Sequence, residues 1–265
     1  MTVTIEQATM SLALDTRATA KRVGLIVLAT DHTTEADFHR LVVSDSVGLF
    51  ATRIEYANPT TPDNLRAMKP RLTEAAGLIL PDEDLDVVCF GCTSASVVIG
   101  DDVVAAAIRQ AKPGVPVVTP AAAGVLGLRA FGARRISILT PYTPRTSAPM
   151  ADYFEAQGFA IDRFTCLGLE DDREMARISH ASLIENALAS LHPESEALFI
   201  SCTALRSASV VAAIETIVGR PVVTSNQASA WACLHHLGIT PEIADAGRLM
   251  SMPGSTGPLP ADGAA

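Results

Sequence analysis

The sequence predicts an α/β protein built from two pseudo-symmetric, doubly wound halves, each a four-stranded parallel sheet flanked by helices, with an active site between them. Three observations lead to this prediction. Short apolar runs alternate with helical stretches, the order of elements restarts near residue 135, and similar segments recur at intervals of roughly 105 to 113 residues. Such alternation is typical of parallel sheets that are covered on both faces.

Each element of the first half follows from apolar periodicity and from helix-start signals. Residues 22–28 form an apolar run typical of a buried strand, and residues 33–43 follow as a helix with Thr33 or Thr34 as its cap. The later elements of this half are an alternating strand at 53–57, a helix at 62–79 with Asp63 in its first turn, a strand at 86–90, a helix at 94–110, a short strand at 115–118 and a helix at 120–131.

The second half repeats the pattern. It contains strands at 135–139, 159–164, 197–200 and 221–223, and helices at 146–157, 175–191, 205–218 and 225–237. We place the first half at 21–120, joined by the helix at 225–240, and the second half at 121–224. Residues 1–20 form a polar N-terminal extension. Residues 241–265 form a Pro- and Gly-rich tail that we expect to be disordered or pinned to a neighbour.

Composition excludes several classes of protein. The net charge is −9 and no basic stripe is present, which argues against a nucleic-acid partner. The N-terminus lacks the pattern of a signal peptide, and apolar runs stay shorter than the roughly 18 residues of a membrane span. Five cysteines without a framework pattern indicate free thiols in a reduced, cytoplasmic protein. The hydrophobic content of 48% favours a homo-oligomer, a dimer or a tetramer.

Two segments are near-copies of each other, and each places a cysteine just after an apolar strand. They are Asp86 to Ser94, which contains Cys92, and Glu196 to Ala204, which contains Cys202. Ligands of open parallel sheets bind beyond the carboxyl ends of the strands. Two related halves that face each other would therefore place Cys92 and Cys202 on opposite sides of one small substrate.

Both cysteines precede a predicted helix, whose free N–H groups favour a thiolate. The backbone amides of Thr93, Ser94, Thr203 and Ala204 would form an anion site for a substrate carboxylate.

Other uses of the cysteines are less favoured. A free cysteine is most often a small buried hydrophobe, which fits Cys89, Cys166 and Cys233. Cys89 and Cys92 have the spacing of a redox pair, but Cys89 falls within a strand and should point away from Cys92. We predict no metal site, because the histidines are scattered.

The segments Gly91-Cys92-Thr93-Ser94 and Ser201-Cys202-Thr203-Ala204-Leu205-Arg206-Ser207 resemble the aspartate/glutamate racemase superfamily, in particular its maleate cis–trans isomerase and arylmalonate decarboxylase branch. The resemblance extends from about Arg22 to Gly238. It implies a cofactor-independent enzyme with a cysteine pair between two α/β halves, and a substrate contact by Tyr142. In the racemases one thiolate removes the α-proton and the other thiol returns one. In maleate isomerase the first cysteine adds to the double bond, and the decarboxylase retains only the second cysteine.

One loop departs from this family pattern. Where the isomerases carry an asparagine that binds a substrate carboxylate, this chain has His32, with Asp31 beside it. A second expected asparagine is replaced in the segment Asp171-Asp172-Arg173. Acidic residues would repel a dicarboxylate and favour an amine or amidine cation. This pattern resembles the subgroup associated with ectoine and hydroxyectoine degradation. Structural roles stay open for these positions: Tyr142 in a Pro-flanked turn, His32 as a helix cap and the acidic pair at a solvated helix start.

Three functions are consistent with these residues. The first is an isomerase or racemase of a small carboxylate that uses Cys92 and Cys202 in complementary roles. The second is a two-lobed binding protein whose thiols are unreactive. The third is a decarboxylase that uses Cys202 alone.

Overall fold

Two parallel sheets organise the chain, whose computed structural model describes residues 3–241 and 243–253. Their strand orders are β2-β1-β3-β4 and β6-β5-β7-β8, so the second sheet repeats the topology of the first. The strands are β1 (Lys21–Leu28), β2 (Val47–Ile54), β3 (Val87–Gly91), β4 (Val117–Val118), β5 (Arg135–Tyr142), β6 (Ala160–Leu169), β7 (Ala197–Ile200) and β8 (Val222–Thr224). The predicted α/β fold of two pseudo-symmetric halves is confirmed.

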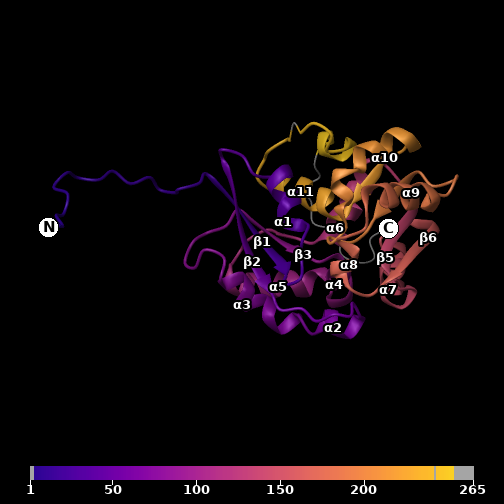
Figure 1. The fold of residues 1–265 in the computed structure, drawn as a ribbon, viewed down its shortest axis with the longest axis horizontal. Helices are drawn as coiled ribbons and strands as arrows, with labels where there is room; N and C mark the ends of the chain where they lie inside the picture. Colours follow the sequence, from indigo (N-terminus) through magenta and orange to yellow (C-terminus); the bar gives the residue numbers. More distant parts are fainter. Residues whose placement is uncertain (1–2, 242, 254–265) are drawn as a thin grey trace.

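Helices cover both faces of the sheets (Figure 1). They are α1 (Thr34–Leu41), α2 (Pro62–Arg66), η1 (Lys69–Arg71), α3 (Leu72–Gly77), α4 (Thr93–Ile99), α5 (Asp101–Ala111), α6 (Pro120–Ala130), α7 (Pro144–Ala156), α8 (Asp172–Met175), α9 (His180–Ser190), η2 (Arg206–Ser209), α10 (Val211–Val218), α11 (Ser225–His236) and η3 (Arg248–Ser251). The helices α3 and α5 pack on one face of the first sheet, and α1 and α11 pack on the other.

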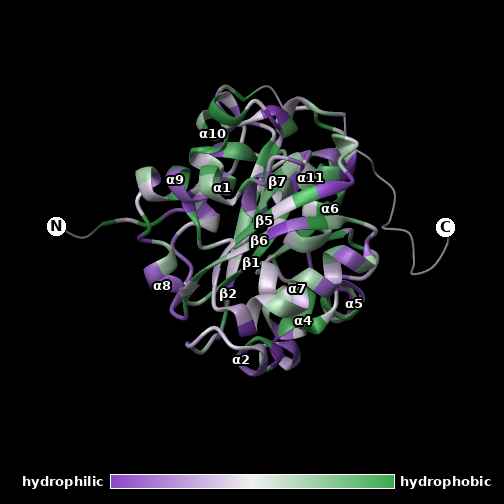
Figure 2. Cartoon of the chain, turned by 90° about the vertical axis from the view of Figure 1, so that its right-hand side faces the viewer, coloured by the Kyte–Doolittle hydropathy of each residue, from purple (hydrophilic) through white to green (hydrophobic). Residues whose placement is uncertain are grey.

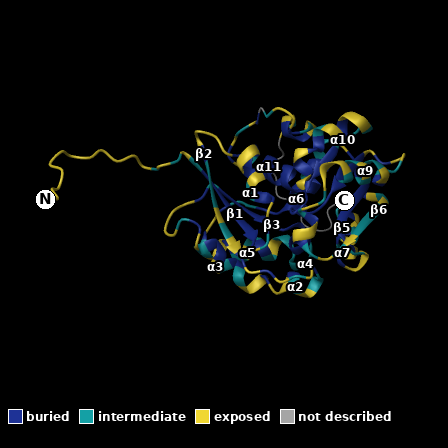
Figure 3. Cartoon of the chain, viewed as in Figure 1, coloured by how far each residue is buried: buried dark blue, intermediate teal, exposed yellow. Residues whose placement is uncertain are grey.

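Hydrophobic residues concentrate on the central strands, as the colouring of Figure 2 shows, and the same strands are buried in Figure 3. In β1, residues 22–28 are all buried, because the sheet is covered on both faces. Helix α6 approaches β7 closely at Gly124, where an added Cβ atom would lie 2.6 Å from the ring of Phe199. This contact requires glycine.

Helix α11 lies where the two halves meet. It contacts α6, α1 and β3, and every residue from Ser225 to Leu234 is buried. A capping box begins the helix: the Thr224 side chain accepts a hydrogen bond from the Gln227 amide, and the Gln227 side chain accepts one from the Thr224 amide. The start of this helix is therefore rigidly placed beside the strands of both sheets.

Several predicted elements are shorter or shifted. The strand expected at 53–57 runs from Val47 to Ile54, in register with the whole of β1. Gly48, inside this strand, weakens the strand pattern in the sequence. The helix expected at 62–79 is divided into α2, η1 and α3, because Pro70 lacks the N–H group that would donate to the Arg66 carbonyl oxygen in a continuous helix.

Three further helices are also interrupted. The helix expected at 94–110 is broken at Gly100, whose φ of 95° is incompatible with a continuous helix. The helix expected at 175–191 becomes α8 and α9, which are joined by a short turn, and the one expected at 205–218 begins as the short η2 before α10.

The two ends of the described chain differ. Residues 3–16 form an extended, exposed arm that leaves the body of the protein (Figures 1 and 3). Part of the tail expected to be disordered is instead packed: Leu249 and Met250 are buried, and the Trp231 Nε1 atom donates to the Met252 carbonyl oxygen at 3.0 Å. Apolar side chains in the tail explain the difference. Residues 254–265 lie outside the described residues.

Candidate active site

A small cavity lies between the two halves at the carboxyl ends of the central strands. Its free volume is about 10 Å³, close to the space that one water molecule needs. The side chains around it come from both halves: Leu28, Asp31, Tyr56, Thr60, Leu65, Cys92, Ser94, Tyr142, Asp172, Cys202, Thr203 and Ala204. The structure therefore brings both predicted cysteines to one cavity, and a substrate has to widen it on entry.

The first cysteine begins a helix in the expected manner. Cys92 has an extended backbone, with φ of −149°, and is the N-cap of α4. Its backbone N–H donates to the Phe90 carbonyl oxygen at 2.9 Å, and its Sγ atom lies 3.8 Å from the Ser94 Oγ atom. The Ala95 amide also donates to the sulfur. Cys92 is thus held by groups of its own turn.

The second cysteine has a different backbone despite its similar sequence. Cys202 has φ of 105°, a region that residues other than glycine rarely adopt. Its N–H donates to the Ser225 Oγ atom at 3.0 Å. The amides of Ala204 and Leu205 donate to its sulfur. The two turns are therefore similar in sequence and distinct in conformation.

The protonation state of the thiols differs from the sequence-based expectation. Burial raises the pKa of Cys92 to about 12, and burial also raises the pKa of Cys202 to about 12. The amides that donate to each sulfur lower the pKa, but desolvation is the larger effect. Both thiols are accordingly neutral near pH 7. The expectation of resting thiolates is wrong because it considered the helix N-terminus without the burial.

Tyr142 links the two cysteine turns. It lies at the end of β5, is buried, and its hydroxyl lies beside Cys202 and Ser94. Burial, reinforced by the nearby thiols, raises the pKa of this hydroxyl well above its usual range, so Tyr142 stays protonated. It can donate a hydrogen bond to the sulfur of Cys202.

The four residues whose backbone amides were predicted to bind a substrate carboxylate divide into two groups. Ser94, Thr203 and Ala204 border the cavity, whereas Thr93 is absent from its described lining. The Thr93 hydroxyl instead donates to the Ser225 Oγ atom at 2.8 Å. Because the first amides of a helix have no acceptor within the helix, these turns still present N–H groups that can bind an anion.

Asp31 and His32, which the sequence pattern placed in the substrate site, also differ in position. Asp31 borders the cavity, and its carboxylate accepts from the Thr33 amide at 3.0 Å and from the Thr34 amide at 2.8 Å. These bonds satisfy the start of α1, and burial raises the pKa of Asp31. His32 is exposed and is not among the described lining residues. The loop turns its side chain to solvent.

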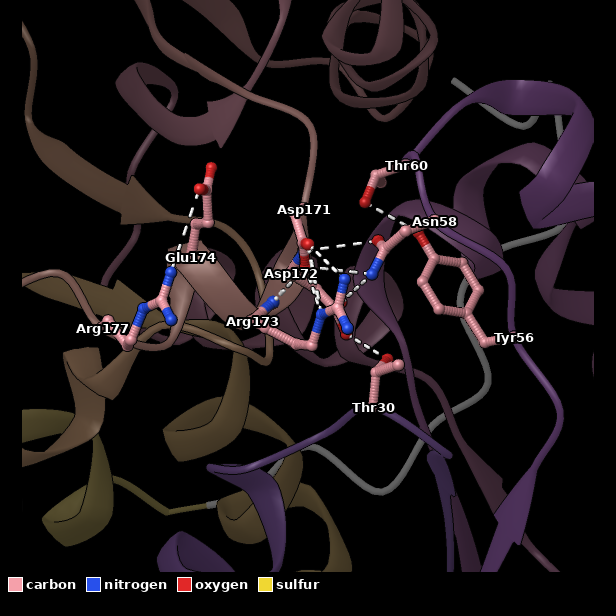
Figure 4. A network of polar contacts seen from close by, with 9 residues as sticks. All are labelled: Thr30, Tyr56, Asn58, Thr60, Asp171, Asp172, Arg173, Glu174 and Arg177. Carbon is pink, nitrogen blue, oxygen red and sulfur yellow. Dashed lines mark hydrogen bonds and ion pairs between the residues drawn. The ribbon is translucent and has the colours of Figure 1, made fainter.

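A polar network at the rim of the cavity joins Asp171 and Asp172, which the sequence pattern indicated, to Asn58 and Thr30, which it did not (Figure 4). The Asn58 side chain donates to the Asp171 carboxylate at 3.0 Å and to the Asp172 carboxylate at 2.9 Å. The Thr30 hydroxyl also donates to Asp172. Nearby, the Thr60 amide donates to the Glu170 carbonyl oxygen at 2.7 Å. The segment between β2 and α2 thereby closes one side of the cavity, although no motif in the sequence marks it.

The lining is acidic. Asp31 and Asp172 are both buried beside the cavity, and no lysine, arginine or histidine occurs among its described lining residues. Within the part of the chain that the structure describes, no group of three or more His, Cys, Asp or Glu side chains could hold a metal ion. No helix in that part is long and apolar enough to cross a membrane.

Comparisons with known proteins agree with this geometry. Residues 61–250 match the model of a protein family described as arylmalonate decarboxylase. A maleate isomerase of Nocardia farcinica is 29% identical over 241 residues, which cover 87% of this chain and 95% of that protein.

Two solved structures are similar in fold and sequence. One is a cysteine-to-serine mutant of Nocardia farcinica maleate cis–trans isomerase with a covalently bound succinylcysteine intermediate; its TM-score is 0.79 at 27% identity, over 87% of this chain and 98% of that chain. The other is a liganded arylmalonate decarboxylase in which a glycine is replaced by cysteine and a cysteine by serine; its TM-score is 0.77 at 26% identity, over 86% and 98% of the two chains.

Proposed function

Because the chain belongs to the arylmalonate decarboxylase family, we propose that it is an isomerase of a small carboxylate that works through Cys92 and Cys202. The observation that carries this proposal is that both thiols border one cavity, which Tyr142 also lines. The similarity to maleate isomerases over nearly their whole length supports the reaction class.

In the proposed reaction the two thiols have complementary roles. Sγ of Cys92 adds to one alkene carbon, and Cys202 delivers a proton to the neighbouring carbon. The proton that Cys92 loses replaces the one that Cys202 delivers. The former double bond is now single and rotates; loss of the same proton and cleavage of the S–C bond then restore the alkene in the other geometry. The covalent intermediate of the Nocardia farcinica relative supports a step of this kind.

For the substrate, we propose a small carboxylate that also carries a hydrogen-bond donor or a positive charge. The carboxylate would bind the amides of the Cys-Thr turns, and the donor would face Asp172. Two buried carboxyl groups and the absence of a cation among the described lining residues support this choice, because a second substrate carboxylate would be repelled. An amidine or diamino acid of ectoine or hydroxyectoine degradation has the required charge. Such a compound has no alkene, so on it one thiolate would remove the α-proton and the other thiol would return a proton to the opposite face.

The reaction class can be tested by NMR. The enzyme is incubated in D₂O with maleate, with arylmalonates and with small unsaturated or α-chiral acids that carry an amine or amidine. We expect isomerised product without CO₂ release, and loss of turnover in Cys92→Ser but not in Cys166→Ser, since Cys166 lies outside the described cavity lining. CO₂ release from a malonate with full activity in Cys92→Ala would instead identify a decarboxylase that uses Cys202. Binding without conversion of any acid would indicate a binding protein.

The substrate class has its own test. Asp172→Asn removes one charge and keeps the shape of the side chain. We expect KM to rise at least tenfold for substrates with an amine or amidine, and to stay unchanged or to fall for a dicarboxylate. An equal effect on both substrate types would contradict the proposed role of Asp172.

A further inference from the structure

The two cysteine turns differ in how their backbones are held. The Cys92 amide bonds within its own turn, to Phe90. The Cys202 amide bonds to Ser225, which is distant in sequence and begins α11. Cys202 also has the positive φ of 105°, which is unfavourable for a side chain with a Cβ atom and persists only when the surroundings impose it. Ser225 is therefore in a position to impose the conformation of Cys202.

One oxygen atom joins both turns. The Ser225 Oγ atom accepts from the Cys202 amide at 3.0 Å and from the Thr93 hydroxyl at 2.8 Å. Thr93 directly follows Cys92 in the chain. Ser225 and Thr93 are fully buried, so water does not compete for these bonds. This buried hydroxyl thus joins the two cysteine turns, beside a second bond in which the Thr203 hydroxyl donates to the Gly91 carbonyl oxygen at 3.1 Å.

The internal repeat has no second copy of this arrangement. Val222-Val223-Thr224-Ser225 aligns with Val117-Val118-Thr119-Pro120 in the first half. Pro120 has neither a hydroxyl nor an N–H group, so it cannot form the equivalent bonds. The serine is an asymmetric feature of an otherwise repeated structure, and it lies on the side that holds Cys202.

We propose that Ser225 is a positioning residue that holds Cys202 in its positive-φ conformation and ties it to the turn of Cys92. The effect of Ser225 on catalysis rests on the proposed function of the two thiols. Its effect on the conformation of Cys202 does not. Its loss would leave the Cys202 amide and the Thr93 hydroxyl without partners in a buried site, and the turn would relax toward a commoner conformation. Displacement of a reacting group by about 1 Å can lower a rate on the order of a hundredfold.

Ser225→Ala removes the shared acceptor, and Ser229→Ala is its matched control. Ser229 is buried one turn further along α11, and its hydroxyl donates to the backbone oxygen of Ser225 at 2.8 Å. Labelling with [¹⁵N]cysteine gives five amide signals, one for each cysteine of the chain. We expect Ser225→Ala to shift the Cys202 signal and to accelerate its hydrogen exchange at least tenfold, with Ser229→Ala leaving the Cys202 signal in place.

A fall in kcat with little change in KM distinguishes a positioning residue from a residue that only stabilises the fold. We expect kcat of Ser225→Ala to fall ten- to a hundredfold with KM within threefold of wild type. If that variant does not fold, Thr93→Val removes one of the two bonds and Thr93→Ser keeps it. The first should then show part of the loss in kcat, and the second should show a smaller loss than the first.

The outcomes separate this proposal from the proposed function. An unshifted Cys202 amide in Ser225→Ala, or equal kcat in Ser225→Ala and Ser229→Ala, would overturn the positioning role. A wild-type protein without turnover on any acid would overturn the isomerase, while the amide exchange would still decide whether Ser225 holds Cys202.

Discussion

Thiol alkylation tests the electrostatics of the cavity without any knowledge of the substrate. Burial raises the pKa of Cys92 and of Cys202 from the ordinary 9.0 to about 12, a difference of about three pH units. At neutral pH the thiolate fraction of each is then roughly a thousandth of that of an exposed thiol. Because the thiolate is the species that reacts, iodoacetamide should alkylate both at least a thousandfold more slowly than free cysteine at pH 7.

The assay follows each cysteine separately by peptide mass spectrometry over a time course, with free cysteine as the competing thiol. Cys166, which borders a surface groove and is only half-buried, should be alkylated before either cavity thiol. In urea all five cysteines should react alike, which controls for intrinsic reactivity. Alkylation of Cys92 or Cys202 at the rate of free cysteine in the folded protein at pH 7 would refute the reasoning. It would mean that the amides of the turns stabilise a resting thiolate despite burial.

Three other perturbations have defined outcomes. The unfolded chain loses the protons of Cys92 and Cys202 above about pH 9 while the folded protein keeps them, so the free energy of unfolding should fall by about 1 kcal/mol per thiol from pH 9 to pH 10. Urea titrations should find this loss reduced in the Cys92→Ser, Cys202→Ser double variant, and an unchanged pH dependence would argue against the raised pKa values. Gly124→Ala should lower the free energy of unfolding by about 1–3 kcal/mol, because the new Cβ atom would lie 2.6 Å from the Phe199 ring, and a melting temperature equal to that of wild type would contradict this packing. Asn58→Ala should raise KM several-fold with a smaller effect on kcat, since the Asn58 side chain bonds the rim of the cavity to Asp172 in the second half. Unchanged kinetics would show that the rim takes no part in substrate binding.

The fold was predictable because its signals are local and repeated. Buried parallel strands appear as apolar runs, and the repeated order of elements indicates two sheets of one topology. The interruptions at Pro70 and Gly100 were visible as residue types, but the apolar periodicity continues through both positions and conceals the breaks. The strand β2 was misplaced because only its last residues alternate clearly.

The site was predictable where a reactive residue type occurs in a repeated sequence context. Cys92 and Cys202 are reactive residue types in matching contexts, so the pair could be identified before its geometry was known. Asn58 could not be identified in this way, because its role depends on a loop that folds onto residues more than a hundred positions away. Neither could the raised thiol pKa values, since burial is a property of the assembled core.

The combined loss of both thiols tests the account most directly. Turnover is compared in wild type, Cys92→Ser, Cys202→Ser and the double variant, on whichever acid the wild-type protein converts. If the two thiols act as a unit on one substrate, each single variant should lose at least a thousandfold in kcat, and the double variant should lose no more than the more impaired single variant. Full turnover in either single variant, or losses that multiply in the double variant, would contradict a shared role for the two cysteines.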